Sequence, residues 1–490
     1  MKKFALFLAS IALCSSLTAC NANPTISTTD PTITQTRNGW KIDAPAYMDG
    51  KLSLDAYNKH LGFDLDSTTQ ADEMQLAYDT TREGFARYLD KVKKNNYNEI
   101  VRTEVNGNLF VEYEKDGKLL YTYYTANANE ARIILDSASV IETQFEYAYT
   151  PQANESTTIY QWALMNDPMG FNATTSPYPN NGMFYIIHQA NDKIIFVDGG
   201  GGRQATDKAV NALLDFLYEI TGKSPTEKIE VSAFILTHAH GDHKAFVEKL
   251  LKNHSDKICI ERAIYNVPYH TGSSNEKSFI NFAKLLKENN PNILYLKPHT
   301  GQSVTLGEVT LDIMLTHEDL VSARSGISRC GADYNNTSTV IKFTAFGRTY
   351  LQLGDYSGSA SDGLEEIFLG LYKNGTAHPA LKCDIVQVAH HAIEGNQANV
   401  YNAVGAKYAF IPQTDTDFDA ESLTMMTNNF QTTINQLYQA NADTEIYLQS
   451  RFVHALTIAQ DGCITHSKQD IKGASDDYAD WLATVPAYQR

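Results

Sequence analysis

The sequence predicts an α/β fold preceded by a smaller α+β unit. With 490 residues, the chain is too long for one ordinary domain, so two folded units are expected. The apolar run at 229–236 is typical of a buried strand, and an apolar stripe at helical spacing follows it at 246–251. The runs 339–343 and 348–353 predict further strands. Hydrophobic residues make up 43% of the chain, which is enough for packed cores.

The first residues have the pattern of an export signal. Two lysines precede an apolar stretch at 4–13, and small residues lead to Cys20. This pattern resembles a bacterial lipoprotein signal, in which residues 1–19 are removed and Cys20 carries lipid. We therefore expect an exported protein, anchored on the outer face of the cell membrane or in the periplasm, with residues 20–39 as a flexible tether. A plain secretory signal is the alternative.

Charge and cysteine spacing narrow the classes of function. The formal charge is −17 for the whole chain, and about −19 once the signal with its two lysines is removed. Such an acidic protein lacks the basic surface of one that binds nucleic acid along an extended groove. Apart from Cys14 in the signal and the lipidated Cys20, four cysteines remain that are too widely spaced for a zinc knuckle. They are interpreted as buried thiols or as one or two disulfides: Cys259, Cys330, Cys383 and Cys463.

Residues 40–150 are interpreted as the small α+β domain. Apolar residues at helical spacing occur at 85–92. Two β-rich runs, 108–113 and 119–124, flank the turn residues 115–118, which indicates a hairpin. No constellation of catalytic residues stands out in this unit, so its role is open.

The second unit, 156–466, begins with two strands, predicted at 182–187 and 193–197, that lead to Asp198 and four glycines. The glycines at 199–202 lack the lysine and the serine or threonine of a phosphate-binding loop. We expect them to form a tight turn under a metal site, with Asp198 orienting the metal ligands.

Three histidines and an aspartate stand within six positions after the strand at 229–236: His238, His240, Asp242 and His243. Side chains alternate along a strand, so His238 and His240 are expected to point to the same side. Asp242 and His243 then lie on the turn into the helix. Imidazole and carboxylate groups suit divalent metal, so this segment can offer two ligands to each of two ions.

Two later strands also end in residues that can bind metal. The strand at 348–353 runs into Gly354 and Asp355, and the run at 384–388 ends in His390 and His391 after one alanine. Each motif alone is weak evidence, because a Gly-Asp pair is usually a turn and a histidine pair is usually exposed. In this order after the first cluster, they predict one shared metal centre.

These motifs, in this order, resemble those of the metallo-β-lactamase superfamily: Asp198, His238-x-His240-x-Asp242-His243, Gly354-Asp355 and His390-His391. More closely, they resemble the branch that contains the hydrolase domain of competence-type DNA-uptake proteins and related phosphodiesterases. Asn-Asn-Thr-Ser at 335–338 and Asp-Ile-Val-Gln-Val-Ala-His-His at 384–391 carry this closer resemblance. The resemblance covers residues 156–466, which leaves 467–490 as a C-terminal tail.

The resemblance implies an αββα sandwich that holds two divalent metal ions, usually zinc and sometimes manganese or iron. It implies that His238 and His240 bind the first ion. It also implies that Asp242 and His243 bind the second, and that Asp355 bridges the two. Two cations that share a carboxylate lower the pKa of a water between them, so that hydroxide is present at neutral pH.

The motif leaves open whether His390 or His391 binds the second ion. We favour His391 as the ligand and expect His390 near the substrate. The expected catalytic residues are then Asp242, Asp355 and His390.

This sequence departs from the family's pattern at two places. Many members have a further histidine before the bridging aspartate, and no histidine here stands in an unmistakable motif. His317 is the best-placed candidate for an additional ligand, and His270 and His299 are others. Ala392 stands where related members usually have glycine, which puts the shape of the local loop in question.

Together, the residues and the resemblance predict a metal-dependent hydrolase that acts on a phosphodiester or a related ester outside the cytoplasm. One alternative is a non-catalytic metal-binding lipoprotein that uses the same fold as a binding module. Another is a β-lactamase, which the extra N-terminal unit, the length and the His-His motif fit poorly. The substrate and the oligomeric state are left open by the sequence.

Overall fold

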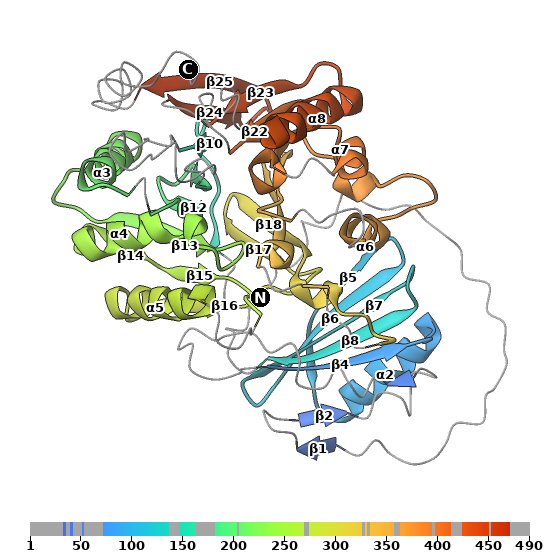
Figure 1. The fold of residues 1–490 in the computed structure, drawn as a ribbon. Helices are drawn as coiled ribbons and strands as arrows, with labels where there is room; N and C mark the ends of the chain where they lie inside the picture. Colours follow the sequence, from blue (N-terminus) through green and yellow to red (C-terminus); the bar gives the residue numbers. More distant parts are fainter. Residues whose placement is uncertain are drawn as a thin grey trace, which may run out of the picture.

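The computed structural model describes most of the chain (Figure 1). The described residues are 33–35, 40–42, 51–52, 72–136, 147–162, 182–202, 205–268, 274–325, 329–330, 334–356, 363–393, 397–412, 424–449 and 452–470. The predicted signal peptide at 1–19, Cys20, and residues 471–490 of the predicted tail lie outside them. Within the predicted tether, β1 (Ile33–Gln35) pairs antiparallel with β2 (Trp40–Ile42), which lies at the start of the predicted small domain.

The first of two large sheets has the strand order β16-β15-β13-β12-β11-β10-β24-β25, with β14 paired to β13. Its strands are β10 (Ser156–Gln161), β11 (Phe184–His188), β12 (Ile194–Asp198), β13 (Ile229–Ile235), β14 (Ile258–Ile260), β15 (Arg262–Ile264), β16 (Leu294–Leu296), β24 (Phe452–Ala459) and β25 (Ile464–Asp470). β12, β13, β15 and β16 run parallel, whereas β10, β11 and β24 pair antiparallel with their neighbours on that side.

The second large sheet has the strand order β23-β22-β21-β20-β19-β18-β17-β9. Its strands are β9 (Tyr147–Ala148), β17 (Ser303–Gly307), β18 (Val309–Leu315), β19 (Val340–Ala345), β20 (Arg348–Gln352), β21 (Ile385–Gln387), β22 (Tyr408–Ile411) and β23 (Glu445–Leu448). β20 to β23 run parallel. Because β9 and β25 belong to these sheets, the two sheets use chain from Tyr147 to Asp470.

Helices cover the outer faces of both sheets (Figure 1). The first sheet packs against α3 (Asp207–Thr221), α4 (Ala245–His254) and α5 (Ser274–Asn289), and the second against α6 (Leu364–Leu371), α7 (Ala398–Val404) and α8 (Thr424–Ala440). Alternate residues of β12 show this two-sided burial. Ile194 and Phe196 pack against the helices, whereas Ile195 and Val197 pack between the sheets. The predicted αββα arrangement is therefore confirmed.

The smaller unit is an antiparallel sheet with one helix. Its elements are β3 (Lys51–Leu52), β4 (Asp72–Tyr78), α2 (Arg82–Lys94), β5 (Asn98–Val105), β6 (Asn108–Lys115), β7 (Lys118–Thr125) and β8 (Glu130–Asp136). The strand order is β3-β4-β8-β7-β6-β5, and β6 and β7 form the predicted hairpin. α2 begins after Thr81, whose hydroxyl accepts the Gly84 N–H, and packs its apolar face on the sheet.

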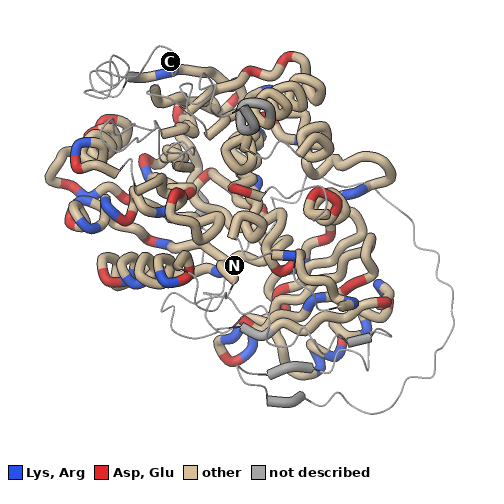
Figure 2. The backbone as a smooth tube through the Cα atoms, in the orientation of Figure 1, with Lys and Arg blue, Asp and Glu red and all other residues tan. Residues whose placement is uncertain are grey.

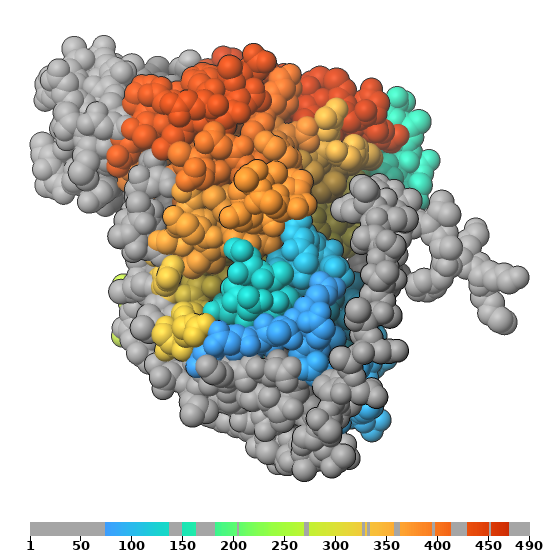
Figure 3. All heavy atoms as spheres, turned by 90° about the vertical axis from the view of Figure 1, so that its right-hand side faces the viewer, coloured from blue at the N-terminus to red at the C-terminus, as the bar shows by residue number. Residues whose placement is uncertain are grey.

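The other face of the smaller sheet packs directly on the sandwich (Figure 3). Tyr121 and Tyr123 share a buried apolar cluster with Val321 and Ala323. The hydroxyl of Tyr121 donates to the Thr300 carbonyl at 2.7 Å. The two units therefore meet through a built interface rather than through a linker alone.

The distribution of charged residues and the length of the helices concern two kinds of partner, nucleic acid and the membrane. Lysine and arginine are interspersed with aspartate and glutamate over the described part of the chain (Figure 2). Among the described residues, no helix is long and apolar enough to cross a membrane.

Candidate metal centre

The ends of four parallel strands bring the site together. β12 ends at Asp198, and β13 runs into the segment that carries His238. β20 runs into Asp355, and β21 runs into His391. β12 is parallel to β13, and β20 is parallel to β21. The carboxyl ends of parallel strands lie at one edge of a sheet, which is the usual place for a site in α/β proteins.

Oδ2 of Asp355 is the point on which the histidine side chains converge. It lies 3.1 Å from Nε2 of His243, 3.6 Å from Nε2 of His238 and 3.7 Å from Nε2 of His391. Nε2 of His390 is further away, at 4.0 Å. Asp355, His238, His243 and His391 are all buried, so these groups face one another in a site of low polarity.

The candidate ligand atoms form two groups that share Asp355, and within each group they lie within 4.8 Å of one another. The first group is Asp242, His243, Asp355 and His391, and the second is His238, His240 and Asp355. The structure thus brings together all six residues that the sequence predicts as metal ligands. Within the described residues, the partner of the His238 and His240 pair is the shared carboxylate and not a further histidine.

Two of the inward-facing rings, His243 and His391, are held by a contact on the opposite nitrogen. Nδ1 of His243 lies 2.9 Å from Oδ2 of Asp198, and Nδ1 of His391 lies 2.8 Å from the Pro412 carbonyl. An acceptor on Nδ1 leaves the Nε2 lone pair directed into the site, which is the arrangement that metal-binding histidines use. Asp198 is buried, as its predicted orienting role requires.

The 3₁₀ turn η5 (Asn335–Thr337) adds residues whose contacts the sequence did not reveal. Oγ of Ser338 lies 3.2 Å from Nδ1 of His238 and accepts the Asp355 N–H at 3.0 Å. Nδ2 of Asn335 lies 3.1 Å from Nε2 of His390. The sequence singled this segment out only through the family resemblance, because neither side chain is a metal ligand type by itself.

Backbone geometry explains the glycines and the unusual loop. Gly354 has φ +58, and a Cβ there would lie 2.9 Å from Cβ of Thr237, so only glycine fits at this close approach. His390, His391 and Ala392 have φ of 45, 52 and 60. Three consecutive side-chain-bearing residues in this region store strain, which commonly occurs at functional sites. Ala392 therefore has a positive φ, which favours glycine.

The electrostatics of the site favour positive charge. Burial would raise the pKa of Asp355, but the rings of His243, His391 and His390 outweigh burial and hold this pKa well below its usual value. Burial disfavours protonation of His243. The carboxylates of Asp355, Asp198 and Asp242 outweigh burial and raise its pKa well above the usual value. Burial and the neighbouring His243 hold the pKa of His238 well below its usual value, so this ring stays neutral.

Two buried atoms test whether the residues fit a metal. Oδ1 of Asp355 and Nε2 of His391 are buried and have no hydrogen-bond partner among the described residues, and the carboxylate of Asp242 lies 3.5 Å from Nε2 of His391. Buried polar atoms are nearly always paired, so unpaired ones call for an explanation such as an ion. A cation between Asp355 and His391 would satisfy both atoms, and the imidazole and carboxylate donors suit zinc, manganese or iron.

The other histidine candidates lie elsewhere. Nε2 of His317 lies 2.9 Å from Oδ1 of Asn266, and His317 belongs to neither ligand group. His299 lies between two carboxylates at the interface with the smaller unit. His270 is outside the described residues.

The four cysteines after Cys20 are free thiols rather than disulfides. Cys330 and Cys383 are buried, whereas Cys259 is half-buried and Cys463 is exposed. The thiol interpretation is therefore correct, and the burial expected for all four is wrong for the last two.

Comparison with known proteins adds only distant structural likeness. No protein-family model and no curated protein matches the sequence. The metallo-beta-lactamase fold protein YhfI from Bacillus subtilis aligns with 64% of this chain and 100% of its own, at 12% identity and a TM-score of 0.33. Tm1679, described as a metal-dependent hydrolase of the beta-lactamase superfamily, aligns with 64% of this chain and 100% of its own, at 10% identity and a TM-score of 0.31.

CmlA, described as a diiron beta-hydroxylase from Streptomyces venezuelae, aligns with 66% of this chain at 11% identity and a TM-score of 0.28. The alignment spans 55% of CmlA. Values this low do not assign the chain to a family. The αββα arrangement and the candidate metal centre stand on the sheets, helices and contacts described above.

Proposed function

We propose that this protein is a metal-dependent hydrolase that holds two divalent ions, zinc first among the candidates, and acts on a phosphodiester or a related ester. The convergence of three buried histidines on one oxygen of Asp355, with Oδ1 of the same carboxylate left unpaired, is the observation that supports it most. The ordered sequence motifs support the same class of enzyme.

The residues have distinct roles in this proposal. Two bound cations would supply Lewis-acid chemistry, which polarises the attacked group and activates water. Asp355 would hold the two ions together, and Asp198 would keep His243 in the tautomer that binds metal. His390 would contact the substrate. The contact between Nδ2 of Asn335 and Nε2 of His390, at 3.1 Å, would hold this ring in place.

Metal content and turnover test the proposal together. We expect about two metal ions per chain in protein purified without chelator, and metal-dependent hydrolysis of bis(4-nitrophenyl) phosphate. Asp355→Ala should lower kcat/KM at least about 10³-fold and lower the metal content, because both ligand groups lose their shared carboxylate. Asp192→Ala, an exposed aspartate outside the site, is the matched control and should change neither.

Several results would contradict the proposal. Full activity after metal removal, or full activity of Asp355→Ala, would rule out the mechanism. Two bound ions without turnover of phosphodiesters, phosphomonoesters, lactones or β-lactams would favour the binding-module alternative.

We further propose that the protein is exported and anchored through lipid on Cys20, on the basis of the N-terminal sequence alone. A labelled fatty acid should be incorporated into the wild type and not into Cys20→Ser. The same variant should move from the membrane fraction to the soluble exported fraction. Equal fractionation of the two proteins would favour the plain secretory signal.

A further inference from the structure

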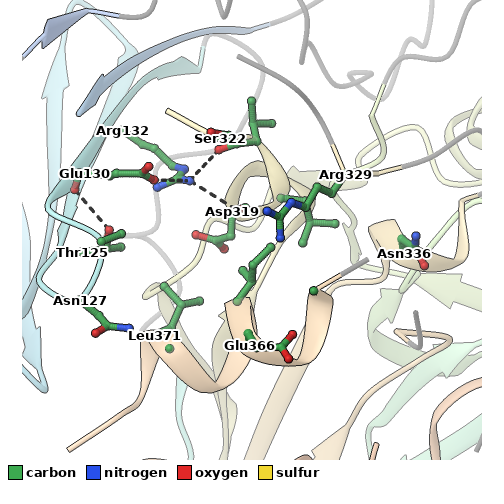
Figure 4. Close-up of a pocket in the computed structure, with 16 residues that line it drawn as sticks. Thr125, Asn127, Glu130, Arg132, Asp319, Ser322, Arg329, Asn336, Glu366 and Leu371 are labelled. Atoms are coloured by element: carbon green, nitrogen blue, oxygen red, sulfur yellow. Dashed lines mark hydrogen bonds and ion pairs between the residues drawn. The ribbon is translucent and has the colours of Figure 1, made fainter. Parts of the chain in front are cut away.

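A cavity lies between the smaller unit and the sandwich, apart from the metal centre (Figure 4). Its volume is about 910 Å³, which falls within the range of small-molecule sites, ~300–1,000 Å³. The turn between β7 and β8 forms one wall, and α6 forms another. The segment that follows η4 (His317–Leu320), together with Arg329, forms a third wall.

The walls of the cavity are fixed by buried hydrogen bonds between the units. Nε of Arg132 donates to the Glu318 carbonyl at 3.0 Å, and Nη2 donates to the Val321 carbonyl at 2.9 Å. At the end of α6, Nδ2 of Asn108 donates to the Leu371 carbonyl at 2.6 Å. A cavity held this way is formed before a ligand arrives, so little ordering free energy is lost on binding.

One turn of the chain connects the cavity to the metal centre. Asn336 lines the cavity, and its neighbour Asn335 contacts His390. Ser338, two residues further on, contacts His238 and Asp355. In Figure 4, Asn336 lies across the cavity from Thr125 and Asn127. A ligand that spans the cavity would therefore approach the metal centre at its Asn336 end.

The chemistry of the walls favours a neutral, hydrogen-bonding ligand. Arg132 is paired with Glu130 at 3.3 Å. Arg329 and Glu366 both approach Gly363, where a Cβ would be 2.7 Å from Nη1 of the arginine and 3.7 Å from Oε2 of the glutamate. The third carboxylate of the lining, Asp319, is buried and accepts the hydroxyl of Tyr123 at 2.9 Å. Amides and a hydroxyl in the walls offer both donors and acceptors to a ligand: Asn127, Asn336 and Ser322.

We propose that this cavity binds the part of the substrate that does not react, a neutral segment rich in hydroxyl or amide groups such as an oligosaccharide or a short peptide. This inference rests on the proposed hydrolase function. It also gives the smaller unit a role, because its β7–β8 turn supplies one wall of the substrate site.

Blocking the cavity tests the inference. A Cβ on Gly370 would lie 3.1 Å from Nδ2 of Asn127, so Gly370→Trp should place an indole ring between α6 and the β7–β8 turn. Lys373→Trp adds the same ring at an exposed position outside the cavity and is the matched control. The substrates are bis(4-nitrophenyl) phosphate and two 4-nitrophenyl phosphodiesters that carry a maltotriose or a trialanine group in place of one ring.

For the wild type, we expect one extended substrate to exceed bis(4-nitrophenyl) phosphate in kcat/KM by at least about tenfold. Gly370→Trp should reduce that preference by at least about tenfold, and Lys373→Trp should keep it. The extended substrate that is preferred identifies the source of the ligand as saccharide or peptide.

Equal losses on all substrates in Gly370→Trp, or no preference in the wild type, would overturn the cavity's role while the hydrolase function stands. Free maltotriose or trialanine that accelerates cleavage of the small probe would also overturn it, since the cavity would then be an effector site. If the wild type cleaves no probe, the hydrolase function fails first. Calorimetry with free maltotriose and free trialanine then tests the cavity alone. Binding that is lost in Gly370→Trp supports the proposed class of ligand, and the absence of binding to the wild type overturns the proposal.

Discussion

Two buried clusters in this molecule combine histidines with carboxylates, and they differ in how completely their atoms are paired. Around Asp355, three ring nitrogens face one carboxylate oxygen, and atoms of Asp355 and His391 have no hydrogen-bond partner among the described residues. Around His299, both ring nitrogens meet a carboxylate. Nδ1 lies 2.9 Å from Glu318, and Nε2 lies 3.3 Å from Asp136 of the smaller unit.

The difference separates a binding site from a structural contact. A cluster whose atoms pair with one another has no capacity left for an ion. The ring of His299 also stacks on Tyr121, with 5.1 Å between the ring centroids. A cluster with unpaired buried atoms is incomplete without a further group. We therefore infer that His299 joins the smaller unit to the sandwich, whereas the histidines around Asp355 serve a metal.

Among the tests of this difference between the two clusters, His299→Leu should have the largest effect. The change leaves the buried carboxylates of Asp136 and Glu318 without their cation, which should destabilise the fold by about 3–5 kcal/mol. Denaturant unfolding measures this loss. Metal content should stay at the wild-type value.

His188→Leu is the matched control for this change. His188 pairs with Asp192 at 3.2 Å, but the aspartate side chain is 65% exposed, so the loss should be below about 1 kcal/mol. Loss of bound metal in His299→Leu without loss of stability would mean that His299 is a ligand after all.

A pH titration of stability should show the same structural contact. Burial disfavours the charged ring of His299, but Glu318 and Asp136 outweigh burial and raise its pKa to about 9. The stabilisation is fully present below pH ~6.5, the unfolded value, and is lost as the pH rises through 9. The predicted loss is about 3 kcal/mol over this interval.

The acid side follows from Glu318. Burial opposes its ionisation, but His299 and the hydrogen bonds lower its pKa to about 2. Its contribution is present above pH ~4.5 and is lost as the pH falls toward 2. Glu318→Gln should flatten the alkaline loss, because His299 then keeps only Asp136. An unchanged alkaline slope in this variant would contradict the pairing.

The same comparison shows what the sequence could predict. The candidate metal centre was predictable because its residues follow strands directly, as in the segment 238–243, so local order in the chain becomes proximity in space. The contact around His299 between the smaller unit and the sandwich was not predictable. Asp136 lies 163 residues from His299 in the sequence, and only the packing of the smaller sheet brings it to the pair of His299 and Glu318.

Apart from Asp198, the sequence did not reveal the groups that support the ligands. Ser338 and the Pro412 carbonyl contact ligand rings, but neither group is of a type that marks a metal site. His317 had the right residue type and a suitable position in the chain, yet it lies outside both ligand groups. Residue type and order in the sequence therefore predict the candidate metal ligands better than the groups that hold those ligands in place.

The smallest expected effect concerns Asp198, which the comparison assigns to the support of the metal centre. Its Oδ1 accepts the Thr237 N–H at 2.8 Å, and its Oδ2 faces Nδ1 of His243 at 2.9 Å. In Asp198→Asn, one side-chain atom becomes an NH₂ donor. The oxygen is required at the Thr237 N–H, so the NH₂ group must face His243 and make its Nδ1 an acceptor. The ring then carries its proton on Nε2, the atom that faces Asp355.

Metal affinity should therefore fall by about 10–100-fold in Asp198→Asn, which corresponds to about 1.4–2.8 kcal/mol. Competition with a chelator of known affinity measures this change. Asp136→Asn is the matched control, because it alters the buried partner of His299 in the other cluster. It should lower stability and leave metal affinity unchanged. Equal metal affinities of Asp198→Asn and the wild type would show that Asp198 supports the turn after β12 and does not set the tautomer of His243.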